Sequence, residues 1–135
     1  MMSQHIILKS YNGKYLSITP NGKIMFDKNN IKEADILIMN YIGKYITLRI
    51  KSGKYLSVTT NATVEIDKDK PGISERFEIE WLDNDWFVLK SNYGFYFTTQ
   101  KDGRLDVNQK EIGPNEKFSL TVQKVESLFE YLNYL

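Results

Sequence analysis

The chain has 135 residues, 41% of them hydrophobic, which suits a single domain with its own core. Its 18 basic and 17 acidic residues nearly cancel, so no strong field is expected to draw it to nucleic acid or an anionic membrane. There is no cysteine, signal-peptide pattern or membrane-spanning apolar run, so we expect a soluble cytoplasmic protein without disulfides or membrane insertion.

One motif occurs three times along the sequence. A leucine followed by a basic residue leads into a turn that ends in glycine, and a tyrosine two residues after that glycine begins the next strand. The leading leucines, Leu8, Leu48 and Leu89, are separated by 40 (48 − 8) and 41 (89 − 48) residues. A fixed period of this length indicates a repeat architecture. We place the repeats at about residues 5–45, 46–85 and 86–122.

Each repeat is predicted to form four short strands joined by tight turns. In chain order, the expected strands are 6–9, 15–19, 23–26 and one centred on Leu37, then 47–50, 55–59, 63–66 and one centred on Phe77, then 87–90, 96–100, 104–107 and one centred on Phe118. Within the second strands, the tyrosines Tyr15, Tyr55 and Tyr96 are expected to point into the core, and Lys14 and Lys54, which precede two of them, outward.

About twelve strands with no helical period between them predict an all-β fold. Three blades fall below the usual minimum of a propeller, and an open solenoid needs polar end repeats that this chain lacks. A closed three-fold arrangement instead removes the exposed sheet edges. We therefore predict a β-trefoil over residues 1–122, a six-stranded barrel with three hairpins closing one end.

The segment 123–135 does not follow the repeat. Its apolar residues fall at the spacing i, i+3, i+4, i+7 and i+10, which is one face of an amphipathic helix; they are Val125, Leu128, Phe129, Leu132 and Leu135. A helix this short needs a surface to lie on. We expect a short C-terminal helical tail that either covers its own barrel or frays, or that acts as a docking or dimerisation element.

The repeated motif carries a family resemblance. Gly13-Lys14-Tyr15-Leu16-Ser17 and Gly53-Lys54-Tyr55-Leu56-Ser57, together with Glu75-Arg76-Phe77-Glu78-Ile79, resemble the fascin-like family of β-trefoils over about residues 5–122. That family includes the actin-bundling fascins and the hisactophilins. The resemblance implies a non-catalytic module that binds or cross-links actin filaments. The chain has one histidine, His5, so the pH-dependent binding of the histidine-rich members is not carried over.

A single histidine and no cysteine leave no catalytic triad, no Cys-His pair and no multi-ligand metal site to predict, so we expect neither an enzyme nor a bound cofactor. The candidate contacts for an acidic protein partner such as actin are Lys14, Lys54, Lys23 and Arg104. A second hypothesis is a carbohydrate-binding trefoil, in which an exposed Trp81 would stack on a sugar. A third is an interaction scaffold that uses the C-terminal helix.

Overall fold

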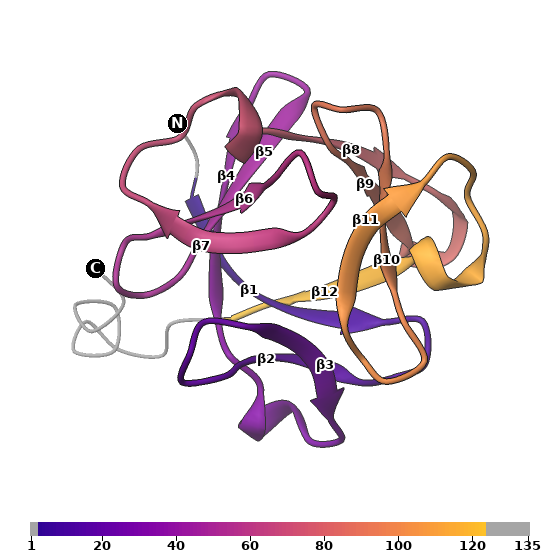
Figure 1. Cartoon of the computed structure of the whole chain (residues 1–135). Helices are drawn as coiled ribbons and strands as arrows, with labels where there is room; N and C mark the ends of the chain where they lie inside the picture. Colours follow the sequence, from indigo (N-terminus) through magenta and orange to yellow (C-terminus); the bar gives the residue numbers. More distant parts are fainter. Residues whose placement is uncertain (1–2, 124–135) are drawn as a thin grey trace.

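A computed structural model describes residues 3–123, and these residues form an all-β fold of twelve strands (Figure 1). The predicted helical tail, apart from residue 123, lies outside the described residues. The strands are β1 Ser3–Ser10, β2 Tyr15–Ile18, β3 Ile24–Lys28, β4 Leu37–Ile42, β5 Tyr45–Arg49, β6 Tyr55–Val58, β7 Val64–Lys68, β8 Phe77–Trp81, β9 Phe87–Lys90, β10 Tyr96–Thr99, β11 Leu105–Gln109 and β12 Phe118–Val122. Four of the connections between strands contain a short 3-10 helix: η1 Ile31–Glu33, η2 Ile73–Glu75, η3 Asp83–Asp85 and η4 Pro114–Glu116.

Six strands, the first and fourth of each repeat, close into a barrel. Every neighbouring pair is antiparallel, in the cyclic order β1, β4, β5, β8, β9, β12. The ring closes where β1 lies beside β12, with Ile6 opposite Val122 and Ser10 opposite Phe118. Each fourth strand begins at, rather than being centred on, its predicted leucine or phenylalanine. The barrel leaves no unpaired edge along this ring.

The second and third strands of each repeat form the hairpins β2–β3, β6–β7 and β10–β11. Figure 1 shows these three hairpins arranged around the centre of the molecule. Their first strands send Leu16, Leu56 and Phe97 into the core, where all three are almost fully buried. The prediction that the neighbouring tyrosines fill the core was wrong, because those side chains are only half-buried and lie outside the core cluster.

Equivalent backbone hydrogen bonds join neighbouring hairpins at two places. The amide of Phe26 donates to the carbonyl of Gly103 at 2.7 Å, and the amide of Val107 donates to the carbonyl of Ala62 at 3.0 Å. Ala62 and Gly103 occupy equivalent places in their repeats, and both have positive φ, 65° and 92°. The first junction is tighter, because a Cβ on Gly103 would lie 2.7 Å from the carbonyl oxygen of Phe26.

Buried carboxylates tie the second and third hairpins to the connections that lead back to the barrel. In each case one oxygen accepts a hydroxyl hydrogen bond from the hairpin and the other accepts a backbone amide three residues earlier in the chain. The partners and distances are Ser57 (2.6 Å) and Gly72 (2.7 Å) for Glu75, and Thr98 (2.6 Å) and Gly113 (2.7 Å) for Glu116.

The equivalent residue in the first repeat is the shorter Asp35, and its contact differs. One carboxylate oxygen accepts the backbone amide of Ile18 at 2.6 Å. The hydroxyl of Ser17, which matches Ser57 and Thr98, donates instead to Asp27 at 2.7 Å. The first repeat therefore departs from the other two at the point where its hairpin meets the barrel.

Candidate functional site

A cleft of about 210 Å³ lies between the hairpins of the first and third repeats. We call it the hairpin cleft; its charged lining residues are Lys14, Asp27, Lys101 and Asp102. Phe26 and Gly103 form part of its wall, and the hydrogen bond from the amide of Phe26 to the carbonyl of Gly103 joins the two hairpins there. The lining combines basic and acidic groups, which suits ionic contacts with a partner rather than a buried small molecule.

Three of the four predicted basic contacts lie on these two hairpins. Lys14 lines the cleft and donates a hydrogen bond to the side chain of Asn29. Lys23 is exposed in the turn before β3, two residues from Met25, which forms a bridge with Arg104 across the two hairpins. The structure thus brings together residues that are about 80 positions apart in the sequence.

Arg104 already forms ion pairs with two acidic neighbours in its own hairpin. Its guanidinium lies 3.6 Å from a carboxylate oxygen of Asp102 and 3.4 Å from one of Asp106. The arginine side chain is 46% exposed, so both pairs are screened by solvent and add little stability. Lys101, which sequence reasoning missed because it looked like an ordinary turn residue, lines the cleft beside them.

The remaining two predicted residues lie elsewhere. Lys54 is in the second repeat, where its ammonium group pairs with Asp69. Trp81 ends β8 and is 49% exposed, with its ring tilted against Phe87 at a centroid distance of 5.1 Å. The hairpin cleft therefore contains neither of them.

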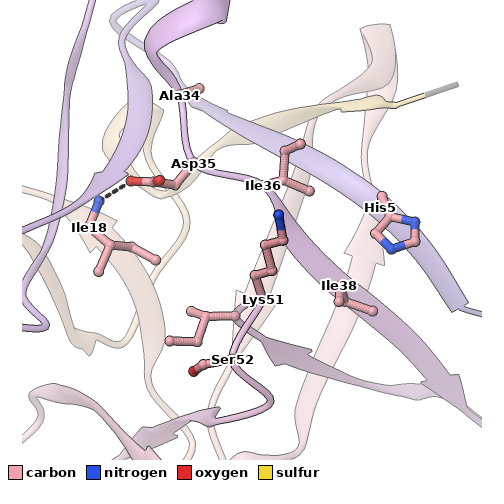
Figure 2. A pocket seen from close by; sticks show the side chains of 9 residues that line it. His5, Ile18, Ala34, Asp35, Ile36, Ile38, Lys51 and Ser52 are labelled. Atoms are coloured by element: carbon pink, nitrogen blue, oxygen red, sulfur yellow. Dashed lines mark hydrogen bonds between the residues drawn. The ribbon is translucent and has the colours of Figure 1, made fainter. Parts of the chain in front are cut away.

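A larger hollow, of about 490 Å³, lies where the first repeat meets the second (Figure 2). Four isoleucines line it, together with His5, Ala34, Asp35, Lys51 and Ser52; the isoleucines are Ile18, Ile36, Ile38 and Ile50. We call this surface the apolar groove. Figure 2 shows Asp35 turned toward the backbone of Ile18, so that its carboxylate is already engaged, and Lys51 extending toward Ile36.

The groove is apolar only at this junction of the repeats. At the junction of the second and third repeats, the equivalents of Ile36, Ile38 and Ile50 are Arg76, Glu78 and Ser91, and they line a polar hollow of about 350 Å³. At the junction of the third and first repeats, the equivalents of His5 and Lys51 are Trp86 and Tyr11. Their rings pack against each other at 5.2 Å, with the Lys117 ammonium 6.0 Å from the Tyr11 ring.

Sequence reasoning did not find the apolar groove. The sequence does contain a signal for the groove, which is a difference between the repeats. At three of the groove positions the chain has isoleucine where another repeat has a charged or hydroxyl side chain. Disagreement between repeats marks positions that the barrel itself does not constrain.

Within residues 3–123, no group of three or more histidine, cysteine, aspartate or glutamate side chains could hold a metal ion. The same part of the chain contains no helix long and apolar enough to cross a membrane.

A six-stranded barrel closed by three hairpins, each from one of three equivalent repeats, defines a β-trefoil. The chain belongs to the Fascin domain family, whose model matches residues 27–120, more than half of its length. Among solved structures, that of Cry35Ab1 matches with a TM-score of 0.77 and 14% sequence identity. The match covers 93% of this chain but only 37% of that one, so the likeness shows the fold alone. No curated protein sequence matched the chain.

Proposed function

We propose that this trefoil is a non-catalytic protein-binding module and that its partner is the actin filament. The observation that supports this most directly is the gathering of Lys14, Lys23 and Arg104 on two adjoining hairpins in a member of the Fascin domain family. Lys101 adds a fourth cation on the same surface. Exposed basic groups of this kind steer an acidic partner and fix its register more than they raise its affinity.

Reversing two of these charges is expected to weaken binding to actin. In the double variant Lys23→Glu, Lys101→Glu, both changes fall on exposed turn residues, so the fold should be retained. We expect co-sedimentation with filamentous actin to fall at least about tenfold at low salt, because each reversal replaces attraction with repulsion. The unsubstituted chain should itself sediment less as ionic strength rises.

The matched control is Lys68→Glu, Lys70→Glu, which makes the same change of net charge on the exposed surface of the second repeat. It should sediment with actin nearly as well as the unsubstituted chain. Equal loss in both variants would assign the effect to net charge and not to the hairpins of the first and third repeats. Failure of the unsubstituted chain to sediment at low salt would contradict actin binding altogether.

Carbohydrate binding is the second candidate, and the exposed ring of Trp81 favours it. Packing against Phe87 holds that ring in place, as a sugar-stacking platform requires. We expect any glycan captured on an array to be lost with Trp81→Ala and kept with Tyr93→Ala, which removes an aromatic side chain of similar exposure elsewhere. An array that stays blank, or a signal that survives the Trp81 substitution, would remove this candidate.

A further inference from the structure

We propose that the apolar groove is the binding site of the chain's own segment 124–135. Three of its isoleucines, Ile18, Ile36 and Ile50, are only half-buried within the barrel and its hairpins, and they face one hollow. An apolar surface of this kind favours an occupant that brings apolar side chains of its own.

The position at which the segment starts points to this groove. The backbone amide of Gln123 donates a hydrogen bond of 2.8 Å to the carbonyl of His5, and His5 lines the groove. In β1, His5 is also paired with Ile38, at the floor of the same hollow. Residue 124 therefore begins beside the groove, and no long connection is needed to reach it.

The length and composition of the segment fit the same site. Twelve residues in helical form extend about 18 Å. Their apolar side chains recur at helical spacing and would form one face toward the isoleucines, while Glu126 and Glu130 belong to the polar remainder. The barrel closes between β1 and β12 before residue 123, so the apolar side chains of this segment are not needed to complete it.

Binding within one molecule is favoured over exchange between two copies. A segment tethered at the rim of its own site has an effective concentration in the millimolar range, far above that of a second molecule in a micromolar solution. The two other junctions offer poorer sites, since one is lined by Arg76 and Glu78 and the other is filled by Trp86 and Tyr11.

Paramagnetic broadening in the full chain tests this placement. Because the sequence has no cysteine, Asn133→Cys provides a single attachment point for a nitroxide. We expect the methyl signals of Ile36 and Ile50 to lose most of their intensity, while those of Ile73 and Ile112, which are exposed on other parts of the surface, keep theirs. Adding Leu128→Asp and Phe129→Asp to the labelled chain should restore the groove signals.

The companion control adds Glu126→Gln and Glu130→Gln instead, which changes the polar side of the segment and should leave the broadening in place. Unbroadened Ile36 and Ile50 signals in the labelled chain would overturn the proposal, as would broadening that persists with both aspartates. A mixture of nitroxide-labelled molecules with separate isotope-labelled molecules should show no broadening at micromolar concentration. Broadening in that mixture equal to that within one molecule would instead assign the groove to a second copy.

Discussion

Replacement of Gly103 by alanine is expected to lower the free energy of unfolding by about 3 kcal/mol. The new Cβ would lie 2.7 Å from the carbonyl oxygen of Phe26, which is backbone and cannot rotate away. The residue also has a φ of 92°, a backbone conformation that residues with a side chain rarely adopt. Relief of the clash would stretch the hydrogen bond from Phe26 to Gly103 that joins the first and third hairpins. Urea denaturation followed by tryptophan fluorescence measures the loss.

Two substitutions at equivalent positions separate the clash from backbone strain. A Cβ on Gly22, at φ 84°, would have no neighbour within 4 Å, so Gly22→Ala should cost only about 1 kcal/mol. Ala62 already occupies the equivalent place in the second repeat at φ 65°, and Ala62→Gly should leave stability unchanged or raise it by up to about 1 kcal/mol. Equal losses in Gly103→Ala and Gly22→Ala would show that close approach to Phe26 is not the cause.

Truncation of Glu116 to alanine is expected to cost about 3 kcal/mol of stability. Glu116 is 7% exposed, and removal of its carboxylate leaves the Gly113 amide without the acceptor that holds it at 2.7 Å. The Thr98 hydroxyl loses its 2.6 Å hydrogen bond and keeps only the longer one to the carbonyl of Asn115 at 3.4 Å. Glu116→Gln should cost about 1 kcal/mol, because the amide oxygen can still accept the backbone hydrogen bond. Denaturation midpoints of the two variants provide the comparison.

The exposed Glu111 supplies a control, since Glu111→Ala removes the same charge a few residues away and should change stability by less than about 0.5 kcal/mol. A double-mutant cycle with Thr98→Val should give a coupling energy of about 1 kcal/mol or more. Additive effects of the two substitutions would mean that the hydroxyl–carboxylate contact contributes nothing to the connection between hairpin and barrel.

The four strands of each repeat and the barrel were predictable because the period of the repeat is visible in the sequence, although the fourth strands begin at Leu37, Phe77 and Phe118 and are not centred on them. The orientation of the motif tyrosines was not. In all three hairpins the register shifts between the tyrosine and the next residue, as at Tyr15 and Leu16. The extra residue of each bulge lies on the partner strand, as at Asp27, so side chains still alternate along the strand of the tyrosine. Alternation requires the tyrosine and the next residue to face opposite sides, but the motif does not show which of these two apolar side chains enters the core.

The surface sites were predictable in part. Lys14 and Arg104 could be selected as basic candidates, but the fact that their two hairpins adjoin depends on packing and is invisible in a linear pattern. The apolar groove draws His5, Ile18, Ile36 and Ile50 from four separate segments. A site of that kind emerges only when the repeats are compared position by position within the folded barrel.

The pairing of β1 with β12 bears on how the protein folds as it is synthesised. Ile6 meets Val122, so the ring of strands cannot close until more than 110 residues of intervening chain have left the ribosome. Contacts of such long sequence separation are slow to form, and the partly made barrel exposes strand edges meanwhile. A nascent chain stalled before β12 should therefore remain protease-sensitive, and protection should appear abruptly once that strand emerges.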